Sequence, residues 1–303
     1  MSSSVATQNS SVRRIAIFGS TQGCGLASLV TMIKRNSPEG SPIEVHALVR
    51  NEQKVIDALS REGIDADALI NAPVNATTRL VIFKGDAMEK ASIQSFFQSV
   101  INNGPLNNVI SSIGAYPVVK WYKPFAPVQF APGMEDICSK TMQFIVDALE
   151  QVVAPQQPDG KVPALIVVAS NGIGKSTHDA LPMLLKPMYG NFLKYPHMDK
   201  EKMERFLHTS YGIQSSDFNP IPSAEKSKEH PALVKERLIV VRPSLLTSGA
   251  AKSSVRSSAK TLPSAYTVSR KDVGNFIAGD CLHLTDRVSE TPVEGGNGYV
   301  VSY

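Results

Sequence analysis

Short runs of apolar residues recur along the chain and alternate with segments in which apolar residues return every three to four positions. The runs have the length of β-strands and show little alternation between apolar and polar positions. Strands that are buried on both faces of a parallel sheet have this pattern. The predicted strands are Ile15–Phe18, Val45–Val49, Leu80–Phe83, Val109–Ile110, Ala164–Val168, Leu238–Val241 and Tyr299–Val301.

The segments between these runs carry the 3.6-residue period of amphipathic helices. Strands and helices therefore alternate, which predicts an α/β fold of the doubly wound kind, with a parallel sheet and helices on both of its faces. The apolar helix positions are Leu26, Leu29, Val30 and Ile33; Val55, Ile56 and Leu59; Ile137, Thr141, Ile145 and Leu149; and Val273, Phe276, Ile277 and Cys281.

Two segments interrupt the alternation. Residues 114–134 are rich in Pro and aromatic residues, and residues 213–231 are rich in Ser, Pro and Lys. Both follow late strands or the helices after them, where an open parallel sheet has its ligand crevice. Four aromatic residues could form an apolar lid over a planar substrate, or could pack against the sheet edge or a partner. They are Trp121, Tyr122, Phe125 and Phe130.

The composition of this 303-residue chain limits the cellular compartment and the kinds of binding partner that we expect. Residues 1–12 are Ser-rich and lack the apolar core of a secretory signal, so we expect a disordered tail before a single domain over residues 13–303. No run of about 18 apolar residues predicts a membrane span. Three widely spaced cysteines favour a reducing compartment, here the cytosol, and a net charge of +4 is too small to indicate nucleic-acid binding.

A glycine-rich loop lies between the first predicted strand and the helix that begins near Leu26. Glycines at such a turn let the backbone approach a pyrophosphate closely, and the positive end of the helix holds the anion. The order of strand, loop and helix therefore predicts dinucleotide binding by Gly19, Ser20, Thr21, Gln22, Gly23, Cys24 and Gly25.

The end of the second predicted strand indicates which dinucleotide is bound. An NAD site usually has Asp or Glu here to bind the ribose 2′-hydroxyl, whereas this chain has Arg50. A guanidinium favours a 2′-phosphate, so we expect NADP(H). The alternative is a solvated arginine at a strand end.

Two further strand ends supply candidate cofactor contacts. Asp86 and Ala87 follow the third strand, where the carboxylate could accept a hydrogen bond from the adenine amino group. Alternatively, Asp86 is the N-cap of the next helix. Ser112, Ile113 and Gly114 follow the fourth strand, and we expect their backbone to pass beside the ribose.

Several motifs together resemble the short-chain dehydrogenase/reductase superfamily, particularly its atypical branch of NmrA-like proteins and biliverdin-IXβ (flavin) reductases. They are RRIAIFGSTQGCG, HALVRN, FKGDA, DKEKMERF, IVVRPSLL and AYTVSRKDVGNFI, and they span almost the whole chain after the tail. The resemblance implies a Rossmann-type domain with a small, irregular C-terminal substrate-binding portion, which we place in residues 174–195, 209–231 and 246–263. It also implies NADP(H) as the cofactor. The glycine spacing is GxxxGxG, as in the main branch, rather than the GxxGxxG of the atypical branch.

In the main branch of the superfamily a Tyr-x-x-x-Lys pair and a Ser carry the chemistry, the Tyr hydroxyl protonating a carbonyl. Lys200 matches the Lys and Ser170 matches the Ser, but Pro196 stands where the Tyr would be. Tyr195 is one residue away, so it is either a surrogate acid or a packing residue. Ser170 would either bind a substrate carbonyl or simply end the fifth strand.

A second glycine-containing loop, residues 169–176 with Lys175, nearly matches the phosphate-binding loop of nucleotide triphosphatases. The magnesium-binding Asp expected after a later strand is missing, because that strand ends in Arg242. We therefore do not predict ATP hydrolysis.

The histidines show no HExxH motif or paired spacing, so a metal site is not expected. His46 lies inside a predicted strand and is expected to pack there. Ordinary surface roles are expected for His178, His197, His208, His230 and His283.

The sequence thus predicts an NADPH-dependent oxidoreductase that acts on a small conjugated or carbonyl-bearing molecule. The missing Tyr favours a different hypothesis, a non-catalytic NADP(H)-binding regulator of NmrA type. A third hypothesis is a non-redox isomerase or cyclase built on the same fold. An oligomer or a protein partner is compatible with each of the three.

Overall fold

The computed structural model describes residues 12–35, 42–73, 76–115, 117–118, 127–215, 217–218, 230–259, 261–287 and 298–303. All seven predicted strands are present and form one sheet with an eighth, in the order β10-β12-β8-β7-β4-β1-β2-β3. Each pair is parallel except β10 with β12. The strands are β1 (Arg13–Phe18), β2 (Ile43–Val49), β3 (Thr78–Lys84), β4 (Asn108–Ser111), β7 (Ala164–Val168), β8 (Leu238–Pro243), β10 (Arg256–Ser258) and β12 (Gly298–Ser302).

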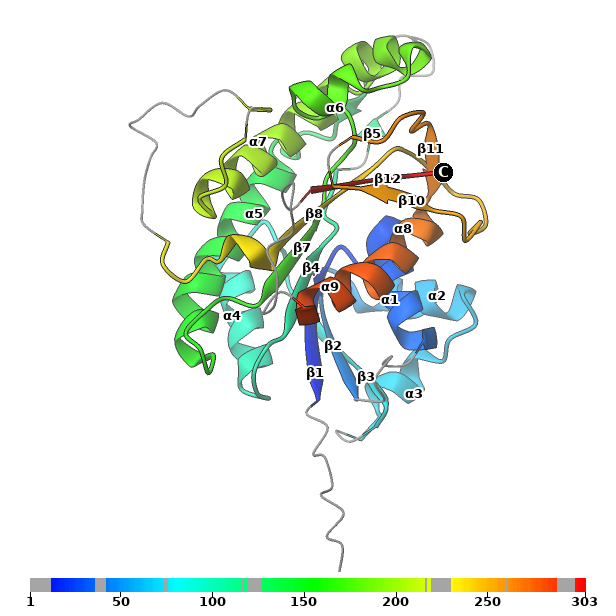
Figure 1. Ribbon diagram of the computed structural model, residues 1–303. Coiled ribbons are helices and arrows are strands. Elements are labelled where there is room, and N and C mark those ends of the chain that lie inside the picture. The colour runs from blue at the N-terminus through cyan, green and yellow to red at the C-terminus, as the bar shows by residue number, and fades with distance from the viewer. Residues whose placement is uncertain are drawn as a thin grey trace, which may run out of the picture.

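Helices cover both faces of this sheet, as Figure 1 shows, so the predicted Rossmann-type fold is confirmed. One face carries α4 (Lys90–Ile101), α5 (Ile137–Ala148) and α7 (Lys194–Ser210). The other carries α1 (Gly23–Arg35), α2 (Glu52–Arg61), α8 (Arg270–Phe276) and α9 (Leu282–Arg287), with α3 (Ala66–Ile70) beside β3.

The alternation of side chains along β1 explains why two hydrophobic cores form. Ala16 and Phe18 belong to the core under α4 and α5, whereas Ile15 and Ile17 belong to the core under α1 and α8. All four side chains are fully buried. A strand in the middle of a two-sided sheet therefore has no polar face, which is why its sequence is a continuous apolar run.

The strand order reverses at β1, which pairs with β2 on one side and with β4 on the other. The connections before and after this point leave on opposite faces of the sheet. The carboxyl ends of β1 and β4 therefore flank the crevice in which open α/β sheets bind their ligands.

The remaining elements are short and surround the carboxyl end of the sheet. Strands β9 (Leu245–Thr247) and β11 (Thr267–Ser269) form a parallel pair, and β5 (Pro117–Val118) pairs with β6 (Gln129–Phe130). Between β7 and α7 lie α6 (Lys175–Asp179), a 3-10 turn at Met183–Leu185 and a π-helical turn at Met188–Phe192. Further short turns are Leu149–Val153, Ala154–Gln156, Lys235–Arg237 and Ile277–Cys281.

Some predicted features lie outside the described residues. Residues 1–11 of the predicted tail are among them, as are residues 216 and 219–229. Of the four lid aromatics only Phe130 is described, in β6, while Trp121, Tyr122 and Phe125 are not. The lid therefore stays a prediction.

Candidate active site

The glycine loop between β1 and α1 is packed so tightly that side chains are excluded at two of its positions. Gly19 has φ +79°, and a Cβ on it would lie 2.6 Å from the carbonyl oxygen of Ser112 at the end of β4. A Cβ on Gly25 would lie 2.2 Å from the carbonyl oxygen of Gly19. The loop thus packs closely against the carboxyl end of β4, and only glycine fits at these two positions.

Other residues of this loop add to the anion site. Ser20 is fully buried, and its Oγ has no hydrogen-bond partner among the described residues. Buried hydroxyls normally have a partner, so Ser20 Oγ is an exception in this loop. Helix α1 begins at Gly23 without an acidic residue in its first turn. Its amides and dipole therefore favour an anion next to the loop. Thr21 and Gln22 are more exposed, and Cys24 is buried.

The ends of β2 and β3 lie beside this loop in the sheet. Arg50 follows β2 and is exposed, and Asn51 next to it caps α2 through its side chain, which accepts from Lys54 N at 3.3 Å. Asp86 follows β3, and its carboxylate accepts from Met88 N at 2.9 Å. The alternative N-cap role for Asp86 is wrong, because α4 begins after Glu89.

The segment after β4 completes the floor of the crevice. Ser112 N donates to Phe18 O at 3.0 Å, which ties this segment to the glycine loop. The Ile113 carbonyl accepts from the thiol of Cys138 in α5 at 3.4 Å, while nothing lies within 4 Å of a Cβ placed on Gly114. Ala87, after β3, packs against the same core as Ile113.

Ser170 and Lys200, two predicted catalytic residues, come together at the carboxyl end of β7. Lys200 Nζ donates to Val168 O at 3.1 Å and to Ala169 O at 2.8 Å, so its ammonium lies at the strand end next to Ser170. Tyr195, the third, is 43% exposed in the first turn of α7. We find no contact that brings its hydroxyl to Ser170 among the described residues.

The structure instead places His197 beside Ser170. His197 Nε2 lies 3.1 Å from Ser170 Oγ, and the ring packs edge-on against the ring of Tyr189 with centroids 5.1 Å apart. His197 is half-buried, not a surface residue as its sequence context suggests. Sequence reasoning missed it because a lone histidine three positions before a lysine matches no catalytic motif. The signal in the sequence was the spacing of three residues between His197 and Lys200, which places both side chains on the same face of α7.

Helix α7 is held against both the sheet and α5 by two buried carboxylates. Asp199 accepts from Cys138 N at 2.8 Å and from Ser139 N at 3.0 Å, and so caps α5 in place of its own N-cap residue. Glu204 binds Arg242 of β8 through several contacts, the shortest 2.6 Å. These contacts fix the position of α7 along its axis, and with it the positions of His197 and Lys200.

The electrostatics of the site link Lys200 to the glycine loop. Burial raises the pKa of the Cys24 thiol to about 11, while the charges of Lys200 and Arg270 act in the opposite direction. The Lys200 ammonium is therefore close enough to act on the loop. Burial lowers the pKa of His197 to about 4, and the charges of Lys200 and His178 add to this effect. His197 is accordingly neutral near pH 7 in the chain without a cofactor.

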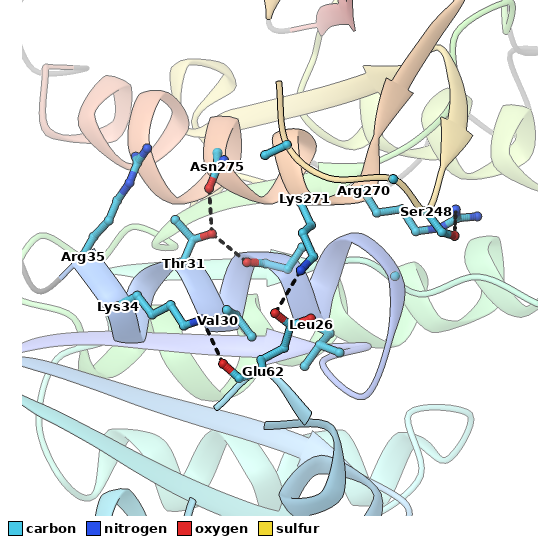
Figure 2. A pocket seen from close by; sticks show the side chains of 14 residues that line it. Leu26, Val30, Thr31, Lys34, Arg35, Glu62, Ser248, Arg270, Lys271 and Asn275 are labelled. Carbon is cyan, nitrogen blue, oxygen red and sulfur yellow. Dashed lines mark hydrogen bonds and ion pairs between the residues drawn. The ribbon is translucent and has the colours of Figure 1, made fainter. Parts of the chain in front are cut away.

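A cavity of about 450 Å³ lies between α1 and α8 (Figure 2). Neither Ser170 nor Lys200 lines it, and of the glycine loop only Gly23 does. Lys271 crosses from α8 to Glu62 at 3.0 Å, and Lys34 Nζ donates to the Glu62 carbonyl at 2.9 Å. Tyr195, the third predicted catalytic residue, does not line it either.

The loop that resembles a triphosphatase motif does not present its lysine to a phosphate site. Lys175 Nζ lies 2.6 Å from Asp179 Oδ2 on the exposed surface of α6. Among the described residues, no cluster of three His, Cys, Asp or Glu side chains could hold a metal ion. Within the same residues no helix is long and apolar enough to cross a membrane.

Comparison with known proteins gives relatives along most of the chain. No family model matches it. A reductase, pytE of Aspergillus terreus, is 27% identical over 297 residues, which cover 95% of this chain and 97% of the relative. An oxidase, pynE of Aspergillus niger, is 26% identical over 215 residues, 64% of this chain and 69% of the relative.

Solved structures share the fold at lower identity. ChuY, an anaerobilin reductase from Escherichia coli O157:H7, matches with a TM-score of 0.54 and 17% identity, covering 95% of this chain and 96% of its own. YwfH, described as an NADPH-dependent reductase involved in bacilysin biosynthesis, matches with a TM-score of 0.53 and 13% identity, covering 94% of this chain and 100% of its own.

These similarities confirm the resemblance drawn from the sequence. The chain shares the Rossmann-type α/β fold of these solved structures, and it is similar to a curated reductase along almost its whole length. Among these proteins, pytE and ChuY are named as reductases and YwfH as an NADPH-dependent reductase. The roles of individual site residues stay predictions.

Proposed function

We propose that this protein is an NADPH-dependent reductase of a small conjugated or carbonyl-bearing molecule. The observation that carries the proposal is the pairing of a glycine cradle with a Ser-Lys site across one crevice. The loop admits only glycine at positions 19 and 25, and it holds the buried hydroxyl of Ser20, which has no hydrogen-bond partner among the described residues. Ser170 and Lys200 lie at the end of β7, two strands from β1.

The chain's own residues would divide the work of binding. The amides from Gly19 to Gly25 and the start of α1 would hold the diphosphate, and Arg50 would pair with a 2′-phosphate. Asp86 and the Ser112–Gly114 backbone would line the adenosine half. Lys200 would bind the hydroxyls of the nicotinamide ribose. Bound NADPH supplies a hydride, and proximity to the substrate accounts for most of the rate.

The substrate would lie against the short elements between β7 and α7. Tyr189 is buried and forms an apolar wall beside His197 and Ser170. A Cβ on Gly172 would lie 2.7 Å from the Tyr189 ring, so this wall is closely packed. Of the proposed substrate portion, residues 174–195 and Asp217 lie together here, because Asp217 accepts hydrogen bonds from Lys175 N and Ser176 N. A flat conjugated molecule suits such a wall.

The test is a titration with NADPH and NADH followed by a turnover screen. We expect calorimetry to show tighter binding of NADPH than of NADH. We also expect NADPH absorbance to fall in the presence of a quinone, an enone or a flavin. No heat with either coenzyme would refute the proposal.

The absence of a Tyr at position 196 favours a second candidate, a non-catalytic NADP(H)-dependent regulator. Pro196 lies in the first turn of α7 and has no group that can donate a proton. Tight coenzyme binding without turnover, together with a partner protein released by one redox form only, would establish this alternative. Turnover with any of the probe substrates would exclude it.

A further inference from the structure

His197 and Ser170 lie together near Pro196, which stands where the family has its proton-donating Tyr. His197 Nε2 lies 3.1 Å from Ser170 Oγ, and Lys200 lies one helical turn further along α7. Pro196 and the exposed Tyr195 leave His197 as the titratable side chain of this turn that contacts Ser170. A proton-transfer partner must lie within about 3.2 Å of the atom it serves, which His197 does.

The hydrogen bonds around Ser170 orient its proton. The Ser170 hydroxyl donates to Asn171 O at 3.3 Å, a long and weak contact. With its proton directed there, Ser170 Oγ can accept from His197 in the tautomer, or in the imidazolium, that carries a proton on Nε2. A substrate oxygen at ordinary hydrogen-bond distance would compete well with the Asn171 carbonyl for the same proton. Ser170 can therefore donate to a substrate while His197 donates to Ser170.

We propose that His197 supplies, through Ser170, the proton that completes reduction of the substrate carbonyl, in place of the missing tyrosine. This inference rests on the proposed reductase function. Ser170 is then the catalytic residue, and His197 is the positioning residue that returns a proton to Ser170 Oγ.

The step balances when His197 enters it as an imidazolium. Bound NADPH would supply the hydride with its electron pair to the carbonyl carbon, and the C=O π bond would break towards oxygen. The Ser170 O–H bond breaks as the substrate O–H bond forms. The His197 Nε2–H bond then breaks as the Ser170 O–H bond is restored. The products are an alcohol, NADP⁺ and a neutral imidazole, which solvent protonates before the next turnover.

The charges around His197 link this proton to the coenzyme. Lys200 on α7 and His178 on α6 face it, and their charges disfavour the imidazolium, as does burial beside Tyr189. The phosphates of a coenzyme held by the glycine loop would offset the Lys200 charge. We therefore expect coenzyme binding to raise the pKa of His197 from about 4. Proton uptake and coenzyme binding would then favour each other.

The first test compares His197→Gln, Ser170→Ala and the double variant with wild type. Glutamine keeps an amide donor for Ser170 but cannot carry a proton. With phenanthrenequinone as the probe, we expect each single variant to lower kcat by at least about 100-fold with little change in KM. Because the two residues form one relay, the double variant should be no slower than the slower single variant. His283→Gln, at an exposed position of α9 on the other face of the sheet, is the control and should stay within about twofold of wild type.

The second test needs no turnover. An NMR titration of the histidine ring signals, with His197 assigned from its absence in His197→Gln, should give a higher pKa for His197 in saturating NADP⁺ than without it. An unchanged pKa, or wild-type kcat in His197→Gln, would overturn the relay. Failure of wild type to bind either coenzyme would instead refute the reductase proposal. Binding and a raised pKa without turnover would support the relay and redirect the search to other substrates.

Discussion

Replacing Gly25 with alanine tests whether the glycine loop is the coenzyme cradle. The added Cβ would lie 2.2 Å from the Gly19 carbonyl oxygen and 3.1 Å from Ser112 Cβ. A normal contact is near 3.4 Å, so the backbone of Gly19 must move by roughly 1 Å. Such overpacking costs about 1–3 kcal/mol of folding stability.

The displacement should cost more in coenzyme binding than in folding. A hydrogen bond from an amide to a charged phosphate contributes about 1.5–3 kcal/mol, so losing one or two lowers affinity by about 3 kcal/mol. This corresponds to roughly a 100-fold increase in Kd for NADPH. Calorimetric titration measures the affinity, and denaturant unfolding measures the stability.

Gly63→Ala provides the matched control. Gly63 has φ +74° at the end of α2, and nothing lies within 4 Å of a Cβ built on it. Alanine there costs about 1–2 kcal/mol of stability through backbone strain alone. We expect Gly63→Ala to be destabilised much like Gly25→Ala but to bind NADPH normally. If Gly25→Ala bound NADPH within about threefold of wild type, the cradle would have to be sought elsewhere.

Three further predictions follow from charged and buried groups. Arg50→Ala should weaken NADPH by about 1.5–3 kcal/mol and leave NADH almost unchanged, as two calorimetric titrations would reveal. Glu204→Gln should destabilise the fold by about 3–5 kcal/mol in denaturant unfolding, because Arg242 stays buried without a counter-charge. The control is Lys202→Ala, which removes an exposed ion pair and should change the stability by less than about 1 kcal/mol. Burial, helped by Arg242, lowers the pKa of His208 from about 6.5 to about 4, so the folded state binds fewer protons than the unfolded state in this range. The neutral, buried His208 therefore stabilises the fold above pH 6.5, and this stability is lost as the pH falls through 4. In thermal melts, His208→Leu should lose less stability over this pH range than wild type. An equal loss of stability in the two proteins would contradict the prediction.

The sheet could be predicted from the sequence because burial on both faces leaves a local signature. Ile15 to Phe18 read as a strand without any knowledge of their neighbours, since every side chain in the run enters one of two cores. The glycine loop could be predicted from the sequence equally well. Its order of strand, turn and helix is contained within a dozen residues.

The reactive end of the site could not be predicted to the same degree because its contacts join distant segments. Ser170 meets His197 across 27 positions, and Asp199 caps α5 across about 60. Neither spacing has a motif. The resemblance predicted Ser170 and Lys200, but it also pointed to Tyr195. Tyr195 is next to Pro196, which stands where the family has its Tyr. The side chain that contacts Ser170 lies two residues further on.

The anchoring of α7 bears on how such a site can diversify. Asp199 and Glu204 secure the helix, yet neither faces Ser170, and the residues that do so stand between and before them. Substitutions at positions 195 to 198 can therefore replace one acid–base side chain by another while Asp199 and Glu204 keep α7 in place. A library randomised at these four codons should consequently yield many folded members with divergent reactivity.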